Sequence, residues 1–168
     1  MKDTLLVTGG AGFIGANFVH HIVKNKPHLR VIVLDALTYA GSVDNLPAAS
    51  LLDADEHVLF RYGNVMNADL VDALMSECQY VVHFAAETHV TRSIYDNKQF
   101  FETDVLGTQV IANAVLRHRK TFKRFIHIST SEVYGTAETP LMDEEHPLNP
   151  MSPYASAKCG ADRLVYSY

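Results

Sequence analysis

Three polar residues, Thr130, Ser131 and Glu132, stand in a row inside the segment HISTSEVYG, which spans His127–Gly135. The apolar residues before them indicate the end of a buried strand, so the trio is expected where a strand leaves the core. A hydroxyl at such a position can hydrogen-bond a substrate hydroxyl, and a carboxylate can remove a proton. The trio is therefore a candidate for proton-transfer chemistry.

Tyr154 and Lys158 form a second candidate pair, in the segment PYASAK. A separation of four residues places both side chains on one face of a helix. A tyrosine that acts as a base must lose its proton near neutral pH, against a reference pKa of about 10, and a neighbouring ammonium favours the phenolate. A shift of about 3 units would need about 4 kcal/mol of differential stabilisation. Because the pattern YxxxK is common, a surface pair without function is the alternative.

The segment VTGGAGFIG places Gly9, Gly12 and Gly15 between the first predicted strand and the first predicted helix. In dinucleotide-binding folds the first glycine permits a tight turn, the second lets a pyrophosphate approach the backbone, and the third lets helix and sheet pack closely. The triplet alone would indicate only a tight turn. Asp35, however, ends the second predicted strand 20 residues after Gly15, where a carboxylate can accept both ribose hydroxyls. Together these residues predict a dinucleotide site, and Asp35 favours NAD over NADP because its charge would repel a 2′-phosphate.

Apolar runs with β-branched residues alternate with longer segments of helical period along the chain. This alternation is typical of an α/β fold of the Rossmann type, a doubly wound parallel sheet whose ligand lies beyond the carboxyl ends of the strands. Four prolines make residues 136–153 a loop over that same edge. The predicted strands are Leu5–Thr8, Val31–Leu34, Val58–Tyr62, Tyr80–Phe84 and Phe125–Ser129. The predicted helices are Gly12–Asn25, Ala68–Ser76, Phe100–Arg117 and Tyr154–Tyr168, the third with Phe101, Val105, Gln109 and Ala112 at helical spacing.

Length and composition are those of one globular domain, residues 1–168, with 48% hydrophobic and 20% charged residues. The net charge of -5 and the lack of a basic patch argue against nucleic acid as the main partner. No window approaches the ~20 apolar residues of a membrane span, and the N-terminus lacks a charged segment before an apolar stretch, so we expect a soluble cytoplasmic protein. Cys78 and Cys159 lie far apart and the nine histidines are scattered, so we expect neither a disulfide framework nor a metal site.

Six segments follow one another in an order and at spacings that resemble a known family: TGGAGFIG, LDALTYAGSVDNL, VVHFAAETHVTRSI, FFETDVLGT, ISTSEVYG and SPYASAK. The family is that of the extended short-chain dehydrogenase/reductases that modify nucleotide sugars, and the segments are most similar to those of dTDP-glucose 4,6-dehydratases over essentially the whole chain. The resemblance implies that Tyr154 takes the proton of the sugar C4 hydroxyl as the C4 hydride passes to NAD, with Thr130 assisting and Lys158 holding the ribose. Glu132 would then remove the C5 proton, water would leave from C6, and the hydride would return to C6.

The resemblance also implies contacts for residues beside these motifs. Residues from Phe84 to Ala86 would line the cofactor, although strand-end packing explains them equally well, and Arg92 and Glu132 are alternatively solvated surface charges. The implied cofactor set is Gly9, Gly12, Phe13, Ile14, Gly15, Asp35, Leu37, Thr38, Asn64, Val65, Phe84, Ala85, Ala86, Tyr154 and Lys158. The implied catalytic set is Thr130, Ser131, Glu132, Tyr154 and Lys158, and the implied substrate set is Thr88, Arg92 and Thr130.

Three residues differ from the usual pattern of dTDP-glucose 4,6-dehydratases. Ser131 stands where the family has an aspartate that protonates the departing C6 hydroxyl, Thr91 replaces an aspartate, and Asp104 replaces an asparagine. GDP-mannose dehydratases share Thr-Ser-Glu and UDP-glucuronate decarboxylases share Ser-Glu. A nucleotide-sugar 4-epimerase or a decarboxylase, for which Glu132 need not drive elimination, therefore remains an alternative. The short chain and Asp104 leave a non-catalytic NAD-binding protein as a further alternative. Asp104 adds negative charge near the tyrosine and opposes phenolate formation unless Arg92 or Lys158 pairs with it.

The helical pattern runs to the last residue, Tyr168, without a C-capping glycine or a following strand. Relatives continue into a smaller C-terminal sugar-binding region, so we expect that this region is missing and that the chain alone turns over weakly or not at all. Such a fragment is expected to expose one sheet edge. Relatives commonly pair through two helices per subunit, which implies a homodimer through Phe100–Arg117 and the helix that begins at Tyr154.

Overall fold

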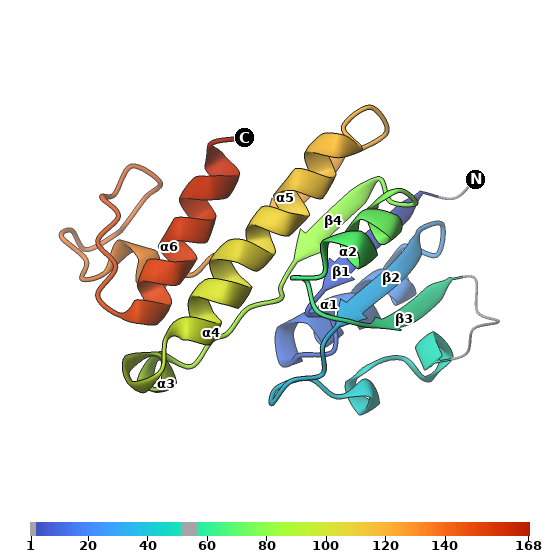
Figure 1. The fold of residues 1–168 in the computed structure, drawn as a ribbon, viewed down its shortest axis with the longest axis horizontal. Coiled ribbons are helices and arrows are strands. Elements are labelled where there is room, and N and C mark those ends of the chain that lie inside the picture. The colour runs from blue at the N-terminus through green and yellow to red at the C-terminus, as the bar shows by residue number, and fades with distance from the viewer. Residues whose placement is uncertain (1–2, 52–56) are drawn as a thin grey trace. The chain divides into compact units, whose positions relative to one another are not determined.

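The computed structural model describes residues 3–51 and 57–168. In this part of the chain, five strands form one parallel sheet in the order β3-β2-β1-β4-β5 (Figure 1). Parallel neighbours require crossover connections, and α-helices lie in those between β1 and β2, between β3 and β4, and between β4 and β5. The Rossmann-type α/β class predicted from the sequence is therefore confirmed. The strands are β1 (Thr4–Thr8), β2 (Arg30–Asp35), β3 (Val58–Tyr62), β4 (Tyr80–His83) and β5 (Arg124–His127).

The chain divides into two compact units. The first, residues 1–85 with 110–128, holds the sheet, and the second, residues 86–109 with 129–168, is helical apart from its loops. The α-helices are α1 (Phe13–Asn25), α2 (Ala68–Met75), α3 (Val90–Tyr95), α4 (Lys98–Phe100), α5 (Thr108–Arg117) and α6 (Pro153–Tyr166). A π-helix spans Phe101–Gly107, and short 3-10 turns span Val43–Asn45, Ala48–Leu51 and Ser131–Tyr134.

Helices cover both faces of the sheet in the first unit. Leu6 lies opposite Ile32 and Val81 in the neighbouring strands, and these side chains pack with α2 and α5 on one face. The alternate residues of the same strands pack with α1 on the other face, where Ala16 and Val19 are buried. Figure 1 shows α2 in front of the sheet and α1 behind it. Because β1 is central and covered twice, all five of its residues are buried.

The strand that precedes the polar trio, β5, lies at the end of the described sheet. Arg124 is exposed, and the side chain of Ile126 is 46% exposed. The expectation of a buried strand at this place is wrong, because in the described part of the sheet β5 has β4 as its one neighbour. The strand also ends at His127, two residues earlier than predicted, although the N–H of Ile128 still donates to the His83 carbonyl at 3.1 Å.

Residues 98–117 form three consecutive helical segments and not the single α-helix predicted over Phe100–Arg117. The π-helix has a wider turn than an α-helix. Phe101 and Gln109, two of the residues noted at helical spacing, are exposed, whereas Phe100 and Asp104 are buried. The buried residues Phe100, Asp104, Thr108 and Ile111 keep helical spacing but each lies one residue earlier than the noted set.

Two boundaries near the second unit's functional residues also differ from prediction. The sequence predicts no helix at α3, whose six residues are too few to show a period. The proline-rich loop ends at Ser152, because Pro153 is the first residue of α6. A proline suits that place, since its missing N–H is not needed in the first turn of a helix.

Candidate functional site

Gly9 and Gly15 are required by packing in the turn between β1 and α1. Gly9 has a positive φ of 67°, and a Cβ at this residue would lie 2.5 Å from the Ala85 nitrogen. A Cβ on Gly15 would overlap the Gly9 carbonyl oxygen. Gly12 differs, because a Cβ there would meet the same oxygen at 3.4 Å, an ordinary contact distance. Gly12 therefore has another role, which fits the glycine that a pyrophosphate approaches.

The first turn of α1 lies at the surface with its N–H groups available to an anion. Its N-cap, Gly12, makes no side-chain cap, and no acidic residue occupies the first turn. The side chain of Phe13 is 82% exposed, and Ile14 is exposed as well. The main-chain N–H groups and the helix dipole of such a turn favour negative charge. This end of α1 therefore fits the pyrophosphate of a dinucleotide.

Asp35, the last residue of β2, has a buried carboxylate that two main-chain donors hold in place. The N–H of Ala11 donates to Oδ2 at 2.9 Å, and the N–H of Leu37 donates to Oδ1 at 2.8 Å. Leu37 adopts a φ of 50°, which turns the chain sharply after the strand, and Thr38 is exposed. A Cβ on Gly41 would lie 2.8 Å from Oδ1, so the backbone passes close to the carboxylate. Each carboxylate oxygen retains a second lone pair, which suits the two ribose hydroxyls.

The other cofactor candidates of the first unit differ in what their side chains do. Val65 belongs to the hydrophobic core that includes α2, so any cofactor contact there would use its main chain. The Phe84 ring packs against Phe18 with ring centroids 5.3 Å apart. Asn64 is exposed, and its Oδ1 accepts the N–H of Met66 at 2.9 Å. Packing therefore accounts for Val65 and Phe84, whereas Asn64 presents its side chain at the surface.

In the second unit, the beginning of α6 is held by hydrogen bonds at its first turn. The Ser152 side chain caps the helix by accepting the N–H of Ala155 at 3.1 Å. The N–H of Tyr154 donates to Ser93 Oγ at 3.1 Å, and this hydroxyl donates in turn to the Val90 carbonyl at 2.6 Å. Ser93 on α3 is fully buried. A contact across 61 residues of sequence thus fixes the residue that the YxxxK pattern singled out.

Tyr154 and Lys158 occupy one face of α6, as their spacing predicts, and both are buried. Tyr154 packs edge-on against Phe100 with ring centroids 6.3 Å apart, and Ala157 completes this small core. The side chain of Lys158 is 4% exposed, and burial lowers the pKa of its ammonium, although Asp104 and Asp162 partly oppose the change. The pair is therefore built into the interior, and the surface alternative does not apply.

The trio lies where β5 has ended, on a 3-10 turn that contacts α6. Thr130 caps the turn, with Oγ1 accepting the N–H of Glu132 at 3.3 Å. Ser131 and Glu132 are exposed. Gly135, which ends the turn, has a φ of 67°, and a Cβ there would overlap the Asn149 carbonyl. The turn therefore presents the hydroxyl and the carboxylate at the surface of the second unit.

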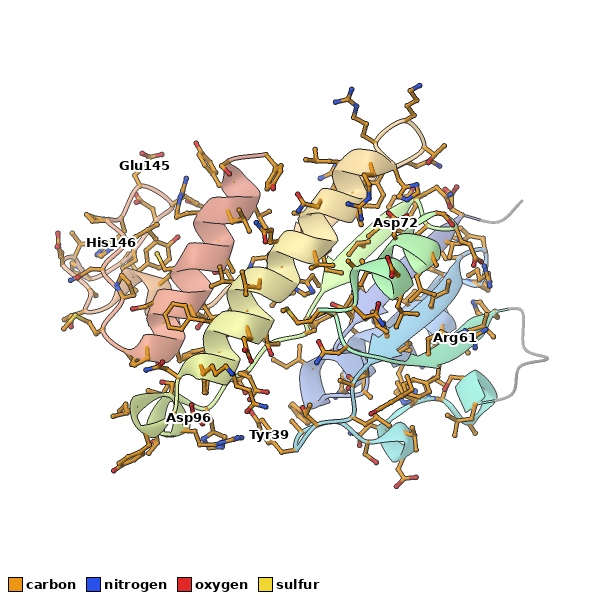
Figure 2. The ribbon with its side chains drawn as sticks, viewed as in Figure 1. Tyr39, Arg61, Asp72, Asp96, Glu145 and His146 are labelled. Atoms are coloured by element: carbon orange, nitrogen blue, oxygen red, sulfur yellow. The ribbon has the colours of Figure 1, made fainter. Side chains whose placement is uncertain are left out.

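The loop before α6 returns to this turn through His146, which Figure 2 labels beside Glu145. Nε2 of His146 accepts the N–H of Glu138 at 3.2 Å, so Nδ1 carries the proton that it donates to the Pro147 carbonyl at 2.9 Å. The imidazole ring of His146 packs edge-on against the Tyr134 ring, with ring centroids 5.6 Å apart. These contacts hold the proline-rich loop to the turn that carries Glu132.

Two buried carboxyl groups lie beside the catalytic candidates, and the sequence indicated only one of them. Glu87 N–H donates to Asp104 Oδ1 at 2.7 Å. Burial raises the pKa of both carboxyl groups; the charge of Lys158 opposes the rise at Asp104, and that of the exposed Arg92 opposes it at Glu87. The partner expected for Asp104 is thus Lys158 and not Arg92. Thr88, the other substrate candidate, is exposed.

Residues 3–51 and 57–168 contain neither a candidate metal-binding cluster nor a candidate membrane-spanning helix. No group of three or more His, Cys, Asp or Glu side chains there could hold a metal ion. No helix of the same residues is long and apolar enough to cross a membrane.

The chain is similar in sequence and in structure to known nucleotide-sugar dehydratases. A sequence profile described as GDP-mannose 4,6 dehydratase matches residues 6–168. The dTDP-glucose 4,6-dehydratase of Streptomyces antibioticus is 48% identical over 98% of this chain and 48% of its own length. The chain is also similar to DesIV, a dTDP-glucose 4,6-dehydratase from Streptomyces venezuelae whose crystal structure was solved with NAD bound. The two sequences are 42% identical and the structures superpose with a TM-score of 0.89, over 98% of this chain and 51% of DesIV.

A more distant likeness extends to enzymes of another reaction. The structure of the UDP-glucose 4-epimerase of Thermotoga maritima, solved with UDP-glucose, matches with a TM-score of 0.84 and 28% sequence identity. The match covers 98% of this chain and 50% of the epimerase. The chain thus spans about half the length of the relatives it matches. On the profile match and these likenesses, the chain belongs to the GDP-mannose 4,6 dehydratase family, among the short-chain dehydrogenase/reductases that epimerise and dehydrate nucleotide sugars.

Proposed function

We propose that this chain is the cofactor-binding and catalytic part of an NAD-dependent nucleotide-sugar 4,6-dehydratase whose substrate is dTDP-glucose. The observation that carries the proposal is the buried Tyr154–Lys158 pair on a helix whose first turn is anchored at Ser93. Relatives named for this reaction support the choice of substrate at 42–48% identity. The chain spans half of those relatives, so the activity is proposed for the protein of which these residues form part.

The proposed NAD site lies in the first unit. The open first turn of α1 would bind the pyrophosphate, and the fixed carboxylate of Asp35 would accept the ribose hydroxyls. The same carboxylate would repel a 2′-phosphate, which supports NAD over NADP. NAD would supply the redox chemistry of the site, taking up hydride from the sugar C4 and returning it at C6.

The proposed proton chemistry lies in the second unit. Tyr154 Oη would accept the proton of the C4 hydroxyl, with Thr130 Oγ1 orienting that hydroxyl and the Lys158 ammonium favouring the phenolate. Oxidation at C4 acidifies the C5 proton, which a Glu132 carboxylate oxygen would accept. Its exposed place on the 3-10 turn, together with the cap that Thr130 forms, supports this assignment. Thr88 and Arg92, both exposed in this unit, are the proposed substrate contacts.

Ser131 decides how water leaves from C6. Because a serine hydroxyl is a poor acid, the proton for the departing oxygen would come from Glu132 after it has taken the C5 proton. A 4-epimerase needs the C4 oxidation but not this elimination, and the likeness to a UDP-glucose 4-epimerase makes that reaction the second candidate. The two reactions use Tyr154 in the same way and differ at Glu132.

The proposal includes a homodimer and a cytoplasmic location. Exposed apolar residues on the two helices expected to pair, Leu116 on α5 and Tyr166 on α6, support the dimer. Light scattering after size-exclusion chromatography would contradict the dimer if it gave a monomer at every concentration. The location is proposed because the reaction needs both NAD and a nucleotide sugar, and cell fractionation tests it.

The experiment that tests the proposed function is a substrate panel with analysis of products by mass spectrometry and proton magnetic resonance. The longer protein that includes these residues is incubated with NAD and, separately, dTDP-glucose, UDP-N-acetylglucosamine, GDP-mannose and UDP-glucuronate. Loss of one water from dTDP-glucose is expected. Loss of carbon dioxide from UDP-glucuronate, or a change of sugar configuration without a change of mass, would replace the proposal by a decarboxylase or an epimerase. No conversion of any substrate would leave a protein that binds NAD without catalysis.

A further inference from the structure

The second unit buries more acid than its buried base can balance. Asp104 on the π-helix is 1% exposed, Glu87 after β4 is 4% exposed, and Lys158 on α6 is equally buried. Fully ionised, the two carboxyl groups would carry two negative charges against one ammonium. Because a buried charge without a partner is costly, one of the two carboxyl groups should hold a proton.

The hydrogen bonds of the two carboxyl groups also indicate that one of the groups holds a proton. Asp104 Oδ1 accepts the main-chain N–H of Glu87 at 2.7 Å, which fixes one carboxyl beside the backbone of the other residue. The second oxygen of each group, Asp104 Oδ2 and Glu87 Oε2, is buried and has no hydrogen-bond partner in the described parts of the chain. Two acceptors without a donor are unfavourable, and a proton on either oxygen supplies the missing donor.

The charged groups that face this pair come from two helices. Lys158 on α6 attracts the charge of Asp104, and Arg92 on α3 attracts that of Glu87. Asp162, one turn after Lys158, faces the ammonium from its own helix. Arg92 is exposed, so water screens its charge, whereas Lys158 is buried with the pair. The ammonium is therefore the main counter-charge.

We propose that Asp104 and Glu87 act together as a positioning pair for Lys158, holding one proton between them so that a single negative charge faces the buried ammonium. The π-helix Phe101–Gly107 carries Asp104, which lies one turn after the buried Phe100 on the interior side of this segment. Like-charge repulsion keeps the second ionisation unfavourable, as in other carboxyl pairs that share a proton.

The direction of the pKa changes is consistent with the geometry. Burial raises the pKa of Asp104 to about 7; the hydrogen bond from the Glu87 N–H and the charge of Lys158 oppose the rise, and the charge of Glu87 adds to it to a smaller extent. Burial likewise raises the pKa of Glu87. The shared proton would thus be lost near or above neutral pH. Its loss would leave the cluster with net negative charge one helical turn from Tyr154, which disfavours the phenolate; this last step alone rests on the proposed function.

The test is a pH titration of the chain itself, followed by nuclear magnetic resonance with no substrate present. Aspartate and glutamate are labelled with carbon-13 at the side-chain carboxyl, and lysine at the ε-carbon. Signals are assigned by their loss in Asp104→Asn, Glu87→Gln and Lys158→Arg. We expect one proton equivalent to leave the Asp104–Glu87 pair near neutral pH and the Lys158 signal to move with the same midpoint. In each single variant, the midpoint of the remaining carboxyl should fall by about one pH unit or more, because its like-charged partner is gone.

The matched control is Asp162→Asn, which removes a negative charge that also faces Lys158 but leaves the pair intact. It should leave the midpoint of the pair within the error of the titration. Ionisation of both carboxyl groups at every pH from 5 to 9, or a midpoint that the partner's substitution does not move, would overturn the proposal. If one single variant fails to fold by circular dichroism, the other still gives the test. Since no substrate is used, the result is independent of whether the protein is a dehydratase.

If turnover is found, a second measurement connects the pair to catalysis. The pH profile of kcat for the longer protein should lose its descending alkaline limb in Asp104→Asn and keep it in Asp162→Asn. A profile of unchanged shape in Asp104→Asn would show that the pair does not act through Lys158.

Discussion

Asp104→Asn should raise the free energy of unfolding of this chain, and the gain should grow with pH. Burial raises the pKa of the Asp104 carboxyl from 3.8 to about 7 in the folded protein. Because the folded state binds this proton more tightly than the unfolded state, the stabilisation is fully present below pH 3.8 and is lost as the pH rises through the folded pKa. An asparagine does not ionise, and its side-chain oxygen can still accept the N–H of Glu87.

The size of the effect follows from the pKa difference. A difference of about 3 units corresponds to about 4 kcal/mol above the folded pKa, as an upper value. About half of this amount, about 2 kcal/mol, is lost between roughly pH 5.5 and pH 8. The attraction to Lys158 is already contained in the folded pKa of Asp104.

Urea unfolding followed by circular dichroism at pH 5.5, 6.5 and 8 measures this difference. The stability of Asp104→Asn relative to wild type should rise by about 2 kcal/mol across that range. Asp162→Asn, the same chemical change at a half-buried residue of α6, should show a constant difference from wild type. A constant or falling difference for Asp104→Asn would refute the reasoning, because it would mean that the folded chain accommodates the ionised carboxyl without cost.

Three further predictions concern the cofactor turn and the proposed reaction. Gly15→Ala should lower the free energy of unfolding by about 1–3 kcal/mol, because its Cβ overlaps a carbonyl oxygen, whereas Gly12→Ala should cost less than about 1 kcal/mol; equal losses in urea unfolding would contradict the packing argument. Asp35→Arg should weaken NAD binding at least about tenfold in isothermal titration calorimetry, since a charge-assisted hydrogen bond contributes about 1.5–3 kcal/mol. The control Asp69→Arg, on the exposed first turn of α2, should bind NAD as wild type does, and equal weakening in both would implicate net charge alone. Glu132→Gln in the longer protein should still oxidise C4 but lose no water, and unchanged water loss would remove Glu132 from the mechanism.

Local patterns of the sequence predict much of this fold, because the apolar runs and glycine turns that define it are local. The bounds of β3 agree with the prediction, and those of the other strands differ by at most two residues at either end. The exposure of β5 could not be predicted, since it depends on which strands become neighbours in the sheet. The π-helix escaped prediction because a period of 3.6 residues assumes the geometry that Phe101–Gly107 does not have.

In the candidate site, too, local sequence patterns predict some residues, whereas others are determined by contacts between distant parts of the chain. Asp35 and the glycine turn follow from a strand-turn-helix pattern, and the Tyr154–Lys158 spacing follows from helix geometry. Ser93 anchors Tyr154 across 61 residues, and Glu87 contacts Asp104 across 17, so no local spacing marks either of them. A buried glutamate after β4 has no signal in a single sequence, because burial of a charged side chain is decided by tertiary packing.

In the proposed reaction, C4 oxidation and C6 reduction belong to one cycle. It is tested most directly by incubating the longer protein with NAD and dTDP-glucose that carries deuterium at C4, and analysing the product by proton magnetic resonance and mass spectrometry. The expected product has lost one water and carries the deuterium at C6. A product that keeps its water, or one that has lost water without deuterium at C6, would contradict the proposed cycle.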